Sequence, residues 1–214
     1  ALVSNSDIVW LIGELDVGGL WIALVDANAN AETLQHRRFT NTGTYSITQG
    51  AARDERLVVA GSLHRNGSPE AWLGFFFVDG FGKPSLFSQR VYSDGVASPS
   101  LRGIVAVAIL PSGAIAAVGQ TMAGPTWRTW ILTTQMFGQV ISGVSVPNAT
   151  TAQGVLGGFR SAAFGTGVTN PWKHLWLVPI NGDGTLPTSG FYWELSDGNT
   201  QLTVRAAASS RDDI

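Results

Sequence analysis

The sequence predicts an all-β protein whose strands form a four-bladed β-propeller. No long segment places apolar residues at positions i, i+3, i+4 and i+7, which is the spacing of an amphipathic helix. The 26 glycines divide the chain into short runs rich in valine, isoleucine, tryptophan, phenylalanine and threonine, as is typical of strands joined by turns. These runs recur in repeats of about 50 residues.

The most regular part of the repeat is an apolar strand that ends in glycine. It occurs four times, and its glycines lie at intervals of 48, 58 and 46 residues. The four strands are residues 9–13, 58–61, 116–119 and 162–165. Because an internal repeat can decide the whole fold, we align the other strands of each repeat relative to these four.

A tryptophan-bearing strand and then a polar turn follow each glycine strand. These strands are residues 20–25, 71–78, 129–134 and 175–180. Their tryptophans are Trp21, Trp72, Trp130 and Trp176, which we expect to fill the gaps between blades. The second repeat has two extra residues between its tryptophan and its turn. We therefore expect residues 75–77, all phenylalanines, to bulge and to present an apolar edge.

Two further strands complete each repeat. An outer strand follows the turn, at residues 33–40, 85–92, 140–146 and 190–195. Another strand precedes the glycine strand in three repeats, at residues 47–52, 104–110 and 151–156. The first repeat lacks this strand, and residues 202–208 look like it. We expect this C-terminal strand to pair with residues 9–13, so that it closes the first blade and leaves no exposed sheet edge.

The repeat resembles the short-repeat β-propellers of secreted bacterial proteins. The likeness rests on Val58-x-Ala60-Gly61, a Trp-Leu strand and an Asp-x-x-Gly turn. The Asp-Gly turn usual in that family between the first and second strands is replaced, for example by Asp54-Glu55. The resemblance implies a propeller fold with a binding or scaffold role, and it implies no catalytic residue.

The strand pattern also fits a β-sandwich or jelly roll, in which short strands with glycine turns recur as well. Residues 1–214 are expected to form a single domain, since no linker-like tract divides them. Four repeats could also be half of a larger ring assembled from two chains.

Composition excludes several classes of partner. Charged residues make up 13% of the chain, against roughly 25% in an average soluble protein, and the formal net charge is −2. Such a surface has no positive field for nucleic acid or anionic lipid. The longest apolar run, residues 104–110, is far shorter than the roughly 20 residues of a membrane helix. The absence of cysteine excludes disulfides and thiolate chemistry. The absence of cysteine suits either a bacterial extracytoplasmic or a cytosolic protein, and the start at Ala1 suits either a mature chain after cleavage or a trimmed one. Of these, we expect an extracellular or cell-surface protein.

The sequence offers no motif for nucleophilic, nucleotide or metal chemistry. It has no Gly-x-Ser-x-Gly, no Gly-x-x-x-x-Gly-Lys-Ser/Thr and no His-Glu-x-x-His. Residues 26–30 begin like a calcium loop, but Ala31 stands where glycine is expected, so a turn is the better interpretation. We expect no cofactor, no metal and no assigned catalytic residue.

Paired carboxylates leave one enzymatic alternative open. A glycoside hydrolase needs two of them about 5–10 Å apart. The candidates in turns and near the chain ends are Asp7, Asp54, Glu55, Asp212 and Asp213. Acidic residues are also common in ordinary turns, which is the simpler interpretation.

Tryptophans outside the repeated position give the candidate ligand site. Trp127-Arg128 and Trp172-Lys173-His174 lie beside glycine or proline, where an exposed indole could stack on a sugar ring. The candidate ligand-binding residues are Trp127, Arg128, Trp172, His174, His64 and Arg65. The sequence thus predicts a non-catalytic module that binds a glycan or a protein through one propeller face. One alternative is a structural subunit of a filament, capsid or surface layer. Another is a glycoside hydrolase that uses the turn carboxylates. The chain could also form a homo-oligomer.

Overall fold

The computed structural model describes residues 2–5, 8–26, 35–40, 43–65, 68–92, 101–123, 126–146, 149–158, 161–169, 172–187 and 193–195. These residues form sixteen strands and no helix. The strands are arranged in four antiparallel sheets, so the predicted all-β, propeller-like fold is confirmed. No helix in the described ranges could span a membrane.

Each sheet consists of four strands that are consecutive in the sequence. Sheet 1 contains β1 (Leu2–Asn5), β2 (Ile8–Glu14), β3 (Leu20–Asp26) and β4 (Gln35–Phe39). Sheet 2 contains β5 (Thr44–Arg53), β6 (Arg56–Arg65), β7 (Ser68–Val78) and β8 (Pro84–Tyr92). Sheet 3 contains β9 (Leu101–Ile109), β10 (Ile115–Ala123), β11 (Thr126–Thr134) and β12 (Val140–Val146). Sheet 4 contains β13 (Ala149–Leu156), β14 (Ser161–Thr169), β15 (Trp172–Ile180) and β16 (Trp193–Leu195).

The first strand of sheet 1 corrects one expectation. We expected residues 202–208 to pair with residues 9–13, but β1 occupies that place, with Leu2 opposite Leu11 and Asn5 opposite Ile8. Residues 202–208 lie outside the described ranges. A hairpin between strands that are neighbours in the sequence closes a very short loop. Pairing through the C-terminal strand would close a loop of nearly the whole chain, at a higher cost in chain entropy.

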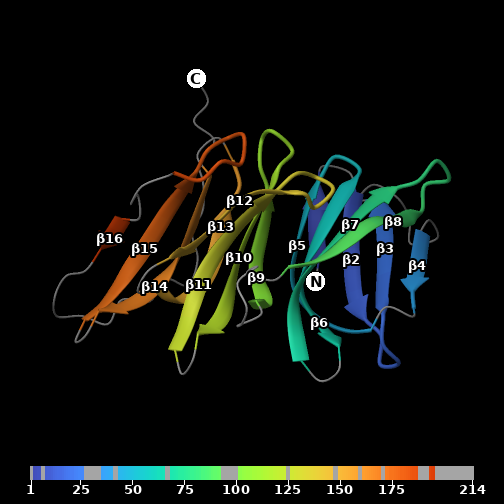
Figure 1. Ribbon diagram of the computed structural model, residues 1–214. Helices are drawn as coiled ribbons and strands as arrows, with labels where there is room; N and C mark the ends of the chain where they lie inside the picture. Colours follow the sequence, from blue (N-terminus) through green and yellow to red (C-terminus); the bar gives the residue numbers. More distant parts are fainter. Residues whose placement is uncertain are drawn as a thin grey trace.

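The sheets stack face to face in the order of the sequence (Figure 1). Three apolar layers separate them: one between sheets 1 and 2, one between sheets 2 and 3, and one between sheets 3 and 4. Sheet 1 and sheet 4 lie at opposite ends of this row (Figure 1). Within the described residues, each end sheet therefore packs against one neighbouring sheet, and each middle sheet packs against two.

The repeated glycine and the repeated tryptophan lie directly opposite each other in every sheet. The cross-strand pairs are Gly13 with Trp21, Gly61 with Trp72, Gly119 with Trp130, and Gly165 with Trp176. In sheets 2, 3 and 4 the strand on the other side of the glycine has a β-bulge beside it. In sheets 3 and 4 the indole lies across the glycine, since an added Cβ would be 2.5 Å from Trp130 Cζ2 and 2.6 Å from Trp176 Cζ2. In sheet 2 the indole of Trp72 instead lies across Gly74 of its own strand.

The phenylalanine run in β7 does not bulge. β6 and β7 pair without interruption from Arg56 opposite Phe77 to Arg65 opposite Ser68. The two extra residues therefore extend the paired region of β6 and β7 by equal lengths on both strands. Phe75 and Phe76 are buried in the layers on either side of sheet 2, and only Phe77 is partly exposed.

Candidate functional site

The turns at one end of the sheets share a five-residue geometry. The N–H of the first residue donates to the carbonyl of the fifth, and the N–H of the fourth, a glycine, donates to the carbonyl of the first. At this end the pattern occurs at residues 79–83, 110–114, 135–139 and 181–185. The fourth residue has a positive φ, for example +83° at Gly138. A residue with a side chain would be strained in this conformation, so glycine is favoured there. The turns of sheets 2, 3 and 4 between their third and fourth strands therefore share one shape.

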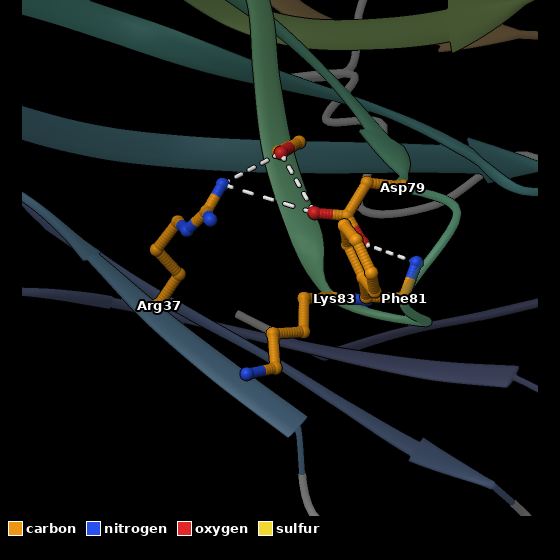
Figure 2. Close-up of polar contacts among 5 residues, drawn as sticks. Arg37, Asp79, Phe81 and Lys83 are labelled. Carbon is orange, nitrogen blue, oxygen red and sulfur yellow. Dashed lines mark hydrogen bonds and ion pairs between the residues drawn. The ribbon is translucent and has the colours of Figure 1, made fainter.

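The turn of sheet 2 packs against β4 of sheet 1 (Figure 2). Arg37 Nη1 on β4 donates to Ser85 Oγ at 2.6 Å and lies 4.0 Å from Asp79 Oδ2. Ser85 Oγ in turn donates to Asp79 Oδ2 at 3.3 Å. The other carboxylate oxygen, Oδ1, accepts the N–H groups of Phe81 at 2.9 Å and Lys83 at 3.0 Å. Asp79 thus both shapes its own turn and joins two sheets.

These contacts make the turn of sheet 2 sensitive to acid. The N–H of Lys83 and the other donors hold the pKa of Asp79 below its usual value of 3.8. A carboxyl whose pKa is lower in the folded state stabilises the fold above the unfolded pKa and loses that effect as the pH falls through the folded pKa. Asp79→Asn should therefore lower the urea midpoint at pH 7, and the difference from the wild type should shrink near pH 3.

Asp183 provides a parallel case in sheet 4, since the N–H of Thr185 lowers its pKa as well. Asp183→Asn should show the same pH dependence. A difference from the wild type that is equal at both pH values would contradict the assigned role of either carboxylate.

The turn of sheet 3 at residues 135–139 packs against β7 and β8 of sheet 2. Tyr92 donates its hydroxyl to the carbonyl of Gly138 at 3.0 Å, and burial raises the pKa of Tyr92 to about 12. A Cβ at Gly138 would lie 2.5 Å from Arg90 Cγ and 3.0 Å from Phe75 Cε2. The close fit fixes the position of the neighbouring Phe137 relative to sheet 2.

An exposed aromatic cluster formed by Phe77, Phe87 and Phe137 bridges sheets 2 and 3. The ring centroids of Phe87 and Phe137 lie 4.6 Å apart, and those of Phe77 and Phe87 lie 6.1 Å apart. Phe87 and Phe137 are each 55% exposed. Phe87 is the extra residue of a β-bulge, since Phe75 pairs with Ser88 and Phe76 pairs with Leu86. The bulge accounts for its outward position.

A polar pocket of about 190 Å³ lies beside this cluster, between the turns of sheets 2 and 3. Arg56 lines the pocket and is the cross-strand partner of Phe77, while Met136, next to Phe137, lines it from sheet 3. Arg53 Nη1 donates to the carbonyls of Leu110 and Pro111 at 2.7 and 2.8 Å, which holds the two walls together. The remaining polar lining comes mainly from Asp54 and Ser112.

The pocket and the aromatic cluster together form our candidate site. It combines exposed ring surfaces with the guanidinium donors of Arg53 and Arg56 and with the carboxylate acceptor of Asp54, whose side chain is 84% exposed. Asp54 has φ +54°, a conformation that aspartate tolerates in tight turns such as this two-residue connection between β5 and β6. This arrangement can bind a ligand that presents both apolar faces and hydroxyl groups.

The structure places the residues predicted from sequence at the other end of the sheets. His64 and Arg65 are exposed at the end of β6, and Trp127 and Arg128 are exposed at the start of β11. Trp172 begins β15, while His174 on the same strand is buried. These strand ends lie in three successive sheets, β6 in sheet 2, β11 in sheet 3 and β15 in sheet 4. That set remains a prediction.

The predicted carboxylates are only partly described. Asp54 and Glu55 form the exposed connection between β5 and β6, whereas Asp7, Asp212 and Asp213 lie outside the described ranges. Asp54 is the one carboxylate among the residues that line the pocket. In the ranges listed above, no three histidine or acidic side chains gather as metal ligands.

Sequence reasoning missed Phe87 and Phe137, although it contained a signal for one of them. Phe81 and Phe137 both occupy the third position of the five-residue turn, where polar residues are usual. An aromatic residue there could have been recognised as a surface group. Nothing in the sequence indicated that β8 bulges at Phe87.

Comparisons with known proteins do not assign a family. No family model matches the chain, and no curated protein matches it. Among solved structures, it is similar to a GH32 beta-fructofuranosidase of Bombyx mori, a mutant in complex with sucrose. The identity is 9% and the TM-score 0.41, over 90% of this chain and 48% of that one, so this chain spans about half the length of that protein. A likeness this distant carries no argument, and the fold assignment rests on the four sheets themselves.

Proposed function

We propose that this chain is a non-catalytic, extracytoplasmic binding module that recognises a glycan at the turn end of sheets 2 and 3. The observation that carries the proposal is the exposed aromatic cluster of Phe77, Phe87 and Phe137 beside the pocket of Arg53, Asp54 and Arg56. Sugar rings have apolar faces and hydroxyl edges, so they suit a site that offers ring surfaces and charged hydrogen-bonding groups together.

The size of the pocket favours a small ligand group. At about 190 Å³ it is smaller than the roughly 300–1,000 Å³ of sites for drug-sized molecules. One saccharide unit could occupy it while the next units of the chain lie over Phe87 and Phe137. Binding through a chain of units would draw on both parts of the site.

A binding role suits the site better than glycoside hydrolysis. The hydrolytic mechanism needs an acid and a second carboxylate about 5–10 Å apart. Of the residues that line the pocket, Asp54 alone carries a carboxylate, and Arg53 Nε lies 4.0 Å from it. The lining of the pocket therefore supplies one carboxylate for the two roles.

The proposal is tested by binding of the purified chain to a printed glycan array. The wild type should bind a subset of the glycans. Phe87→Ala and Phe137→Ala should each weaken that binding about tenfold or more, because removing a central aromatic contact costs about 2 kcal/mol. Both side chains are largely exposed, so their removal should leave the fold intact.

Two matched variants separate this site from other surfaces. Phe81→Ala removes an equally large ring, 87% exposed, that has no part in the cluster, and it should leave binding unchanged. Trp127→Ala removes a 46% exposed indole at the opposite end of the sheets. Loss of binding on Trp127→Ala together with normal binding by Phe87→Ala would move the site to the residues predicted from sequence. Absence of binding to any glycan would overturn the glycan assignment.

A further inference from the structure

The repeated tryptophan has a constant direction in the stack of sheets. Trp72 of sheet 2 lies in the apolar layer shared with sheet 1, Trp130 of sheet 3 in the layer shared with sheet 2, and Trp176 of sheet 4 in the layer shared with sheet 3. All three are at most 5% exposed. In each sheet that has a preceding neighbour, the indole is thus directed at that neighbour.

Trp21 of sheet 1 has the same direction, but within the described residues no sheet precedes it. Its neighbours on β3, Leu20 and Ile22, are buried in the layer toward sheet 2. Since side chains alternate along a strand, Trp21 lies on the opposite face. It is partly exposed, and its recorded ring contact is with His36 of its own sheet, at 6.2 Å.

Sheet 4 shows the reverse situation at the other end of the row. The residue after the repeated tryptophan points toward the following sheet. It is 0% exposed at Ile22, 0% at Leu73 and 1% at Ile131, where a following sheet covers it. The equivalent residue in sheet 4 is Leu177, which is 37% exposed. An apolar position that is covered three times within the chain is open here.

The two end faces are therefore the two halves of one interface that the chain builds three times internally. The sheet 1 face has the tryptophan half, and the sheet 4 face has the half that receives it. We propose that these faces bind each other between two copies of this chain, head to tail, so that sheet 4 of each copy packs against sheet 1 of the other. This inference does not depend on the proposed glycan site.

A second copy is the occupant that the structure favours, because it supplies both missing halves at once. Two such contacts, related by a twofold axis, would close a ring of eight sheets from two copies of the chain. It would continue the stacking already present between sheets 1, 2, 3 and 4 (Figure 1). No other surface chemistry has to be assumed for the partner.

The test measures the mass of the chain in solution by light scattering after size exclusion, over a range of protein concentrations. The wild type should reach twice the 22.6 kDa of one chain. Trp21→Glu and Leu177→Arg, each on one end face, should each weaken self-association at least tenfold. Val144→Arg is the matched control, since Val144 on β12 is 41% exposed but lies on neither end face, and it should associate like the wild type.

Mixing the two end-face variants separates the proposal from misfolding and from other dimers. A mixed pair contains one contact in which both faces are wild type, so the mixture should form dimers that neither variant forms alone. A dimer that survives either substitution would overturn the proposal, as would a mixture that does not associate. A wild type that stays monomeric at every concentration would also overturn it, and would indicate that something other than a second copy covers these faces.

Discussion

Gly119→Ala should destabilise the protein by about 3 kcal/mol, near the upper end of the usual range for overpacked cores. A Cβ at this position would overlap the carbonyl oxygen of Gly103 on β9 and would lie 2.5 Å from Trp130 Cζ2. The oxygen belongs to the backbone of a paired strand and cannot move aside alone. The indole is buried between sheets 2 and 3, so it has no free space to enter.

Gly13→Ala is the matched control, because it makes the same change in the same position of the first repeat. There the nearest atom to an added Cβ is Trp21 Cε3 at 3.6 Å, an ordinary contact. β1 does not pair with Gly13, since its first residue, Leu2, lies opposite Leu11 of β2. We expect a change within about 0.5 kcal/mol. Urea unfolding of both variants checks the prediction, and equal losses would contradict the assigned packing of the repeated glycines.

The repeat itself could be predicted from sequence because its signals are local. A glycine at the end of an apolar strand and a tryptophan in the next strand are neighbours through one hairpin. In the structure this hairpin places Gly61 opposite Trp72 and Gly165 opposite Trp176. The all-β class and the four sheets followed from the same signals.

The candidate site could not be predicted because its parts come from different repeats. Phe87 and Phe137 meet only because the turn of sheet 3 packs against β8 of sheet 2, where Tyr92 holds it. No local pattern encodes that contact. The bulge that turns Phe87 outward depends on how β7 and β8 pair. After Pro84, its first residue, β8 contains no glycine or proline that would indicate a bulge.

The position of the first strand was wrong for a related reason. Residues 202–208 and residues 2–5 both offer a short β-prone run, and pattern alone cannot rank two candidates for one place. Proximity in the chain decides between them, since β1 and β2 are almost contiguous.

One engineered disulfide can show whether the sheets stack in sequence order. An ideal Cβ at Gly103 on β9 of sheet 3 lies 3.8 Å from the Cβ of Ser62 on β6 of sheet 2, close to the mean separation in disulfides of about 3.8 Å. The chain has no cysteine, so any disulfide formed must be the engineered one.

We predict that Ser62→Cys combined with Gly103→Cys loses both free thiols on mild oxidation by forming a disulfide within one chain. The oxidised form should gain up to about 4 kcal/mol over the reduced form, as expected for a closed loop of roughly 40 residues. The control pair, Ser62→Cys with Gly157→Cys, joins sheets 2 and 4, which sheet 3 separates, and should keep its thiols. Free thiols in the first pair, or a disulfide within the control pair, would contradict the stacking order.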